Sequence, residues 1–388
     1  MANEGGPTEP TVYDGTANQQ FNSQLLAHTA VEYLPRFRQV IFNAMPLLKV
    51  FAVNAFGQDN LVDHGTFGNA EAVSSSDKGI EFHDGGAQFE FPLLTTAPSG
   101  KVIGRMGNVN PEYKEPAVTG AYAYKRMYWS VYVPEEAVMD NRGNQRMMNW
   151  LDNQLKLAQL AAARDIDYVL TSHSSAPTGF TTEGLPYMIS VTQGAASNAT
   201  GRISASANTY WQNKINQCLS VGGGGEFDRP LTFLRKLEAL IIAVRELGGS
   251  SDSQVLAATK GAYQYYRRAI YADATGRGAT TLVFKKYDAV ALDHAPFMGS
   301  PLMYDGFIQV PNGGTASREA VYVMDLNELK LHVKRDQFFK VESWDAPRAK
   351  DDQRFFQMNI WFRGIPGVTD RRIQGVCYDI PANPDVVS

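Results

Sequence analysis

Three features of the sequence predict an α+β fold. A long amphipathic helix is predicted in the middle of a chain that elsewhere alternates strand-like and turn-like segments. A tyrosine-rich region of alternating character precedes this helix, and a region of mixed helices and strands follows it. The chain has 388 residues, 44% of them hydrophobic, so it can bury more than one hydrophobic core.

The N-terminal residues predict an arm and not a packed element. Gly, Pro, Thr, Asn and Gln dominate the first part of residues 1–25, which leaves few side chains to bury. We expect this arm to become ordered only against another molecule. Residues 26–65 are expected to form short helices, interrupted at Pro35, that lead into the strands.

Residues 66–133 are expected to form an extended β ribbon. The stretch IEFHDGGAQFEFPL predicts a hairpin that turns at 84–86, and AYAYKRMYWSVYV predicts one long strand. One face of that strand carries Tyr122, Tyr124, Arg126, Tyr128 and Tyr132. Its other face is also partly apolar, and the ribbon has too few strands to form a core of its own. We therefore expect it to lie outside the subunit core and to be covered by another subunit.

The long helix is predicted at about residues 144–170, from the stretch MNWLDNQLKLAQLAAARDIDYVL and the residues before it. Its apolar positions recur every three or four residues, which predicts a stripe that faces the core. The stripe comprises Met147, Leu151, Leu155, Ala158, Ala162, Ile166 and Val169. The opposite face is expected to meet solvent or another subunit and carries Asn149, Asp152, Asn153, Lys156, Gln159 and Arg164. Asp165 and Asp167 are two residues apart, so they should point away from each other and form no shared site.

A second region, residues 229–352, is predicted to be a compact α+β domain that begins after the glycine-rich stretch VGGGGEFDRP. The final residues read as a long ribbon, DDQRFFQMNIWFRGIPGVTDRRIQGVCYDI, that returns beside the long helix. The domain that contains the helix is therefore expected to be discontinuous, with residues 134–228 and 353–388.

Charge and cysteine content limit the function classes. Lys and Arg number 36 against 40 Asp and Glu, so the whole molecule offers no basic surface for tight nucleic-acid binding. Cys218 and Cys377 are expected to be unpaired thiols in a reducing compartment. The N-terminus lacks the features of a secretory signal, and no apolar run approaches the roughly 20 residues that span a bilayer, so we expect a soluble protein made in the cytoplasm.

No catalytic, cofactor-binding or metal-ligating residues are predicted. The six histidines show no HExxH or similar spacing, and the glycines at 222–225 lack the Lys and Ser or Thr of a phosphate-binding loop. No GxSxG motif occurs. The arginine pair at 371–372 suits phosphates or acidic neighbours, but solvated faces and salt bridges are the commoner roles.

The order of elements resembles that of the major capsid proteins of tailed bacteriophages, whose fold is named after a Hong Kong phage. The best matching stretch is SVYVPEEAVMDN followed by the helix through AAARDIDYVLTSHSSAPTGF, with VYVMDLNELKLHV and RRIQGVCYDI as weaker matches. The resemblance implies that residues 1–25 are an N-arm and residues 66–133 an E-loop. It likewise implies a P-domain of residues 134–228 and 353–388, with the long helix as its spine, and an A-domain of residues 229–352.

The same resemblance implies a structural protein, not an enzyme. It would assemble as hexamers and pentamers into an icosahedral phage head around double-stranded DNA, in the host bacterial cytoplasm, and become part of the virion. The implied partners are a portal protein, a decoration protein, and packaged DNA in weak non-specific contact. A separate scaffolding protein is expected because no long charged or heptad-like segment precedes the arm. No lysine and asparagine pair can be assigned to a covalent crosslink. Candidate E-loop contacts between subunits are Arg105, Tyr124, Arg126 and Tyr128.

Two alternatives remain open from the sequence. An encapsulin-like compartment of the same fold would hold a cargo enzyme in place of DNA, and the contents of native particles distinguish the two. A soluble α+β enzyme with an unrecognised site would require a pocket with perturbed titratable groups.

Overall fold

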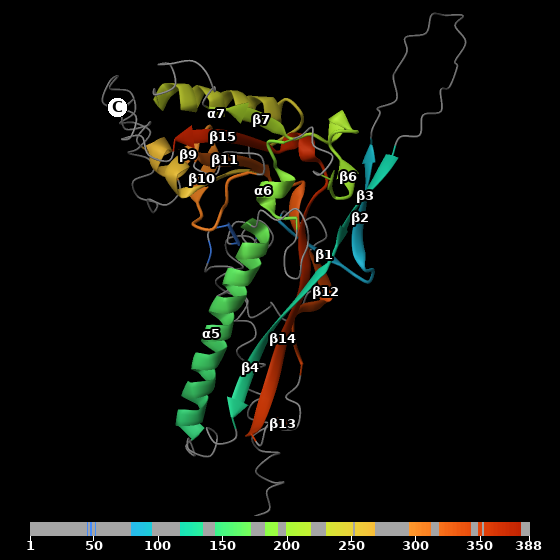
Figure 1. Ribbon diagram of the computed structural model, residues 1–388, viewed down its shortest axis with the longest axis vertical. Coiled ribbons are helices and arrows are strands. Elements are labelled where there is room, and N and C mark those ends of the chain that lie inside the picture. Colours follow the sequence, from blue (N-terminus) through green and yellow to red (C-terminus); the bar gives the residue numbers. More distant parts are fainter. Residues whose placement is uncertain are drawn as a thin grey trace, which may run out of the picture.

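The computed structural model shows an elongated molecule in which one long helix and a ribbon of long strands run side by side, with a second sheet at one end (Figure 1). The N-arm, most of residues 26–65 and residues 95–116, including Arg105, lie outside the described residues. The structure describes residues 45, 47–48, 51, 79–94, 117–134, 144–171, 183–192, 199–218, 230–250, 253–267, 295–311, 318–342, 348–350 and 353–381.

The long helix, α5, spans Asn144–Thr171 and is about 42 Å long at 1.5 Å per residue. It packs against strand β4 (Lys125–Pro134). Of the stripe predicted from the sequence, Leu155, Ala162, Ile166 and Val169 are buried and Ala158 is partly buried against the core. The side chains of Met147 and Leu151 lie outside the described residues. No helix in the described part of the chain is long and apolar enough to cross a membrane.

A five-stranded sheet lies beside this helix (Figure 1). The strands pair in the order β1-β12-β14-β13, and β4 pairs with β14. The pairing of β4 with β14 is antiparallel and continuous from Lys125 to Pro134. Met127, Trp129 and Val131 are buried, and the Trp129 indole donates a hydrogen bond to Asp165 of α5 at 2.8 Å. The other strands are β1 (Ile80–His83), β12 (Leu329–Glu342), β13 (Arg348–Lys350) and β14 (Gln353–Val368).

A six-stranded sheet forms the end of the molecule, in the order β7-β15-β11-β8-β10-β9. Helix α7 (Pro230–Arg245) lies over it, and Leu237, Ile241 and Val244 of this helix are fully buried in a second core (Figure 1). The apolar face of α7 therefore anchors this sheet. The strands are β7 (Lys214–Gln217), β8 (Gln254–Ala258), β9 (Ala295–Phe297), β10 (Ser300–Tyr304), β11 (Arg318–Asp325) and β15 (Gly375–Pro381).

Short elements connect the two sheets. They are α6 (Leu185–Met188), β5 (Ala199–Thr200), β6 (Ile203–Ser204) and the 3-10 turns η3 (Thr209–Trp211) and η4 (Arg371–Ile373). Arg371 holds this region together from a fully buried position: its guanidinium donates to the carbonyl of Met188 at 2.6 Å and to the hydroxyl of Ser190 at 2.9 Å. Arg372 is exposed and pairs with Asp370. The commoner role that the sequence suggested for this arginine pair is therefore right for Arg372 and wrong for Arg371.

The predicted hairpin around residues 84–86 is wrong. Strand β1 pairs in parallel with β12, whereas β2 (Gln88–Leu94) pairs antiparallel with β3 (Ala117–Ala123). Gly85 and Gly86 have φ angles of 70° and 76°, a backbone conformation that glycine adopts without strain, and they turn the chain from one sheet to the other. The predicted single strand is also divided, since β3 ends at Ala123 and β4 begins at Lys125.

The base of the β2–β3 hairpin belongs to the subunit core, so the expectation that the whole ribbon lies outside it is wrong. Ile80, Phe91, Leu93 and Tyr122 are all buried in the larger core cluster. The Tyr122 hydroxyl also donates a hydrogen bond to the carbonyl of Val368 at 3.2 Å. The hydrogen bond joins the hairpin base to β14. The buried rings of Phe91 and Tyr122 stabilise this arrangement, because large aromatic side chains gain free energy when they are removed from water.

The strands do not follow the domain boundaries expected from the sequence. Strand β12 belongs to the sheet beside α5, although residues 229–352 were expected to form a separate domain. Strands β7 and β15 belong to the six-stranded sheet, although both were expected in the domain of the helix. The final ribbon thus divides, because β14 pairs with β4 and β15 pairs with β11 and β7.

The expectation of two unpaired thiols is also wrong. Cys218 and Cys377 form a disulfide with their Cα atoms 6.5 Å apart. The parallel pairing of β7 with β15 brings them together, and the Cys218 amide donates to the carbonyl of Tyr378 at 2.9 Å. A sequence separation of 159 residues concealed this proximity.

Candidate assembly surfaces and a buried polar cluster

The outer face of β4 and β14 carries aromatic and cationic side chains. Tyr128 and Tyr132 are 52% and 53% exposed, and Arg126 is exposed beside them. The Arg126 guanidinium lies 3.7 Å above the ring of Trp361, and the Tyr128 ring is 5.1 Å from the same ring. Trp361 itself is half-buried beneath them. Tyrosine and arginine side chains held rigidly over a tryptophan on a sheet are typical of protein contact surfaces.

Helix α5 presents a second apolar surface, opposite its buried stripe. Leu157, Leu160 and Tyr168 are 61%, 57% and 46% exposed, and their spacing places them on one face with the exposed Arg164. We call these four residues the outer spine surface. Large exposed apolar side chains that recur along one helix face mark an interaction site more often than isolated ones do.

The face opposite the stripe was expected to be polar, and the structure corrects this in part. Asn153, Lys156 and Arg164 are exposed, but Gln159 is buried. The side chains of Asn149 and Asp152 lie outside the described residues. The exposed leucines were not predicted, because only one apolar stripe was expected on the helix.

The predicted E-loop contacts occupy different environments. Arg126 and Tyr128 are exposed on β4, a strand of the sheet beside α5. Tyr124 is only 8% exposed, and its ring lies 4.8 Å from the ammonium of Lys334. Its packing within the subunit prevents Tyr124 from facing a neighbour, so this residue is corrected to a core position.

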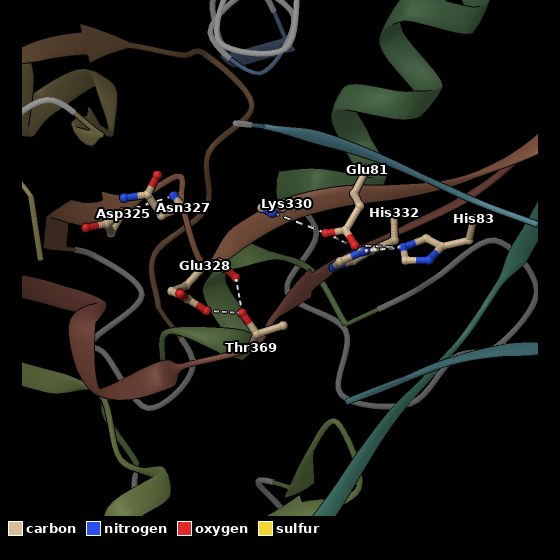
Figure 2. Close-up of polar contacts among 8 residues, drawn as sticks. All are labelled: Glu81, His83, Asp325, Asn327, Glu328, Lys330, His332 and Thr369. Atoms are coloured by element: carbon tan, nitrogen blue, oxygen red, sulfur yellow. Dashed lines mark hydrogen bonds and ion pairs between the residues drawn. The ribbon is translucent and has the colours of Figure 1, made fainter. Parts of the chain in front are cut away.

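A polar cluster lies between β1 and β12, under the base of the hairpin. The parallel register sets Glu81 opposite His332, so their side chains and that of His83 lie on one face of the two strands. Figure 2 shows the Glu81 carboxylate between Lys330 and the two imidazoles. Lys330 donates to Glu81 Oε2 at 3.2 Å, and His83 Nε2 is 3.0 Å from His332 Nδ1.

His332 is fixed from both sides. Its ring stacks on Phe89 with the centroids 3.8 Å apart. On another side lies Gly367, where a Cβ atom would come 2.8 Å from the His332 ring. Two hydrogen bonds hold the turn that leads into β12 (Figure 2). The Asp325 carboxylate accepts one from the backbone amide of Asn327 at 2.9 Å, and the Thr369 hydroxyl donates the other to Glu328.

Burial keeps both histidines of the cluster neutral. The pKa of His332 is well below its usual range because its ring is fully buried, and the neighbouring His83 lowers it further. Burial also lowers the pKa of His83, although the Glu81 carboxylate opposes this effect. The cluster therefore presents two imidazoles in their uncharged form, and across the 3.0 Å contact one ring donates its N–H to the lone pair of the other.

Two acidic groups lie buried where α5 approaches the six-stranded sheet. Asp167 is fully buried, and burial followed by the charge of Asp305 raises its pKa to about 8. Asp305 is stabilised by the amides of Leu47 and Phe307, at 3.4 and 2.9 Å. Asp165 and Asp167 form no shared site: Asp165 accepts a hydrogen bond from Trp129, while Asp167 is buried. The partner that matters, Asp305, is far away in the sequence and could not be identified from spacing.

Asp167 should lower the stability of the subunit as the pH rises. Its folded pKa is above the ordinary value of 3.8, so the folded state holds the extra proton between pH 4 and 8 and loses stability across that window. We expect Asp167→Asn to stabilise the subunit by about 1–3 kcal/mol at pH 8 and by much less at pH 5. Urea unfolding of unassembled subunits at both pH values measures this, and an equal gain at both would contradict the assignment.

Comparisons with known proteins identify this fold. Neither a protein-family model nor a curated protein sequence matches the chain. The structure aligns with the capsid asymmetric unit of cyanophage A-1(L) at a TM-score of 0.54 and 13% identity, over 76% of this chain and 88% of that one. This likeness shows that the chain has the fold of a phage capsid subunit, the Hong Kong phage fold, which confirms the fold that the sequence resemblance predicted.

Two further alignments have TM-scores below 0.5. The capsid of an empty GTA particle aligns at 0.47 with 14% identity, over 85% of this chain and 98% of that one. The SrpI encapsulin of Synechococcus elongatus PCC 7942 aligns at 0.43 with 11% identity, over 79% of this chain and 86% of that one.

Proposed function

We propose that this chain is a structural shell protein that assembles as hexamers and pentamers into an icosahedral phage head around double-stranded DNA. The observation that carries the proposal is the fold shared with the cyanophage capsid subunit over most of both chains. Two surfaces of the subunit support it, because the outer spine surface and the outer face of β4 and β14 expose aromatic and apolar groups that a neighbouring subunit would cover.

The nearly balanced charge of the subunit is compatible with a shell that encloses DNA without binding it tightly. With 36 basic against 40 acidic residues, the subunit has no strong attraction for the phosphate backbone, so packaged DNA would touch the shell weakly. Portal, scaffolding and decoration proteins are further partners expected from the sequence resemblance. The subunit would be located in the virion after assembly in the host cytoplasm.

Negative-stain microscopy of the expressed protein tests the assembly. Closed shells are expected, and a monomeric protein under all assembly conditions would favour an unrecognised enzyme instead. Nuclease-treated native particles are then expected to yield double-stranded DNA. Particles that contain a cargo enzyme and no DNA would show a protein compartment of the same fold.

A charge on the outer spine surface should prevent assembly without unfolding the subunit. Leu157 is 61% exposed, so Leu157→Asp is expected to change the stability by no more than about 0.5 kcal/mol. In a shell, the same charge would be buried against a neighbour without a partner, and we expect loss of shells. Size-exclusion chromatography and microscopy measure assembly, and circular dichroism measures folding.

The comparison variant is Asn153→Asp, which adds the same charge one turn before Leu157 on the same face of α5, at an exposed position that is already polar. We expect this variant to assemble like the parent protein. Normal shells from Leu157→Asp would remove the outer spine surface from the set of subunit contacts.

A further inference from the structure

We propose that Glu81, His83 and His332 form a binding site for a divalent transition-metal ion of the zinc class. Three ligand atoms from two strands converge, and all lie within 4.8 Å of one another. Glu81 and His83 come from β1 and His332 from β12, so the ion would join two segments that are about 250 residues apart in the sequence. The site is independent of shell assembly because one subunit supplies all three ligands.

The distances suit direct coordination. Zinc binds nitrogen and oxygen ligands at about 2.0–2.2 Å, which separates neighbouring ligand atoms of a tetrahedron by about 3.3 Å. In the cluster His83 Nε2 is 3.0 Å from His332 Nδ1 and 3.6 Å from Glu81 Oε1. His332 Nδ1 is 3.8 Å from Glu81 Oε2. Adjustments of less than an ångström would bring these three side chains to the separations that such an ion requires.

The ligand types select the class of ion. Two imidazole nitrogens and one carboxylate favour zinc, cobalt, nickel or copper over magnesium and calcium, which prefer oxygen ligands. His83 Nε2 and His332 Nδ1 already face each other at 3.0 Å, so both imidazoles direct a nitrogen toward the same point. Lys330 hydrogen-bonds Glu81 Oε2 and leaves Oε1 toward His83, which is the arrangement of an outer residue that orients a metal-binding carboxylate.

The cluster is built and still accessible. His332 is fully buried between Phe89 and Gly367, so its ring cannot move far. The side chains of His83 and Glu81 remain 22% and 29% exposed, which gives an ion a route from solvent and leaves a position for a water ligand. Bound here, the ion would clamp β1, the strand that leads to the hairpin, onto β12.

Metal titration of the untagged, chelator-treated full chain tests the proposal. With zinc as the probe in isothermal titration calorimetry, we expect one high-affinity ion for each subunit and a melting temperature that rises with zinc concentration. With cobalt as the probe, the visible spectrum should show the intense bands of four- or five-coordinate cobalt. Calcium and magnesium at the same concentrations should leave the melting temperature unchanged.

Variants identify the ligands. His83→Gln and Glu81→Gln alter partly exposed side chains and should weaken zinc binding on the order of 10- to 100-fold or more, since even the loss of an orienting partner has that effect. His332→Gln should do the same, with circular dichroism to establish that it folds. The matched control is Asp84→Asn, which removes a neighbouring exposed charge but no ligand and should bind zinc within a few-fold of the parent.

The zinc-binding results for these variants either support the metal site or overturn it. Loss of the site in His83→Gln and Glu81→Gln, with binding retained in Asp84→Asn, supports it. Zinc binding that persists unchanged in His83→Gln would place the ion elsewhere and overturn it. Absence of stoichiometric binding, or cobalt spectra of an octahedral aqua ion only, would leave the cluster as a hydrogen-bonded group without a metal and would also overturn it.

Discussion

Leu155→Asp is expected to leave no soluble folded subunit. Leu155 is 6% exposed and lies in the larger hydrophobic core, on the face of α5 that packs toward the sheet of β4. An aspartate at this position would be an unpaired charge in an apolar environment, at a cost of several kcal/mol. Because the total stability of a domain is about 5–15 kcal/mol, this loss is large enough to shift most of the protein to aggregated forms.

The soluble fraction after expression, and circular dichroism of any protein recovered, measure this effect. Leu157→Asp is the matched control, since it places the same charge two residues later on the same helix at a position that is 61% exposed. The control should be soluble and folded. If Leu155→Asp folded and assembled normally, the inward face of α5 would have to be assigned to other residues.

The contrast between these two leucines shows what the sequence could predict. The helix was predicted at about residues 144–170 and observed at Asn144–Thr171, because the spacing of apolar residues along a helix is a local property. The second apolar surface, with Leu157 and Leu160, was not predicted. Leu157 and Leu160 lie on the side of the helix away from its main stripe, and only one apolar stripe was expected on this helix.

Pairings between distant segments could not be predicted. The stretch around residues 84–86 has the glycines of a hairpin turn, yet β1 pairs with β12 and β2 pairs with β3. Local turn chemistry specifies that the chain bends but not which strand it then meets. The disulfide between Cys218 and Cys377 has the same explanation, since it depends on β7 lying beside β15.

The polar cluster illustrates the same limit for a candidate site. The alternation of Glu81 and His83 places both on one face of a strand, which the sequence does show. The third group, His332, is about 250 residues away and arrives only through the parallel register of β1 with β12. A search for metal motifs by local spacing therefore could not find it.

Residues 95–116 can be deleted without removing strands β2 and β3. Leu94 and Ala117 are directly opposite each other at the end of the β2–β3 ladder, so a two-residue Asn-Gly turn in place of residues 95–116 can close the hairpin without altering its register. This change keeps Phe91, Leu93 and Tyr122, the large buried side chains of the hairpin base. We expect the shortened subunit to be soluble, with cooperative unfolding close to that of the parent, and to form no closed shells.

A larger deletion distinguishes assembly from folding. Removal of residues 80–122 also removes Ile80, Phe91, Leu93 and Tyr122 from the core, and each loss of a large buried side chain costs about 2–5 kcal/mol. That variant should fail to fold, whereas the shortened hairpin should fold and fail only in assembly. Calorimetry and microscopy on both variants measure the difference. Complete shells from the shortened hairpin would show that residues 95–116 are dispensable for assembly, and loss of its cooperative unfolding would show that they belong to the subunit core.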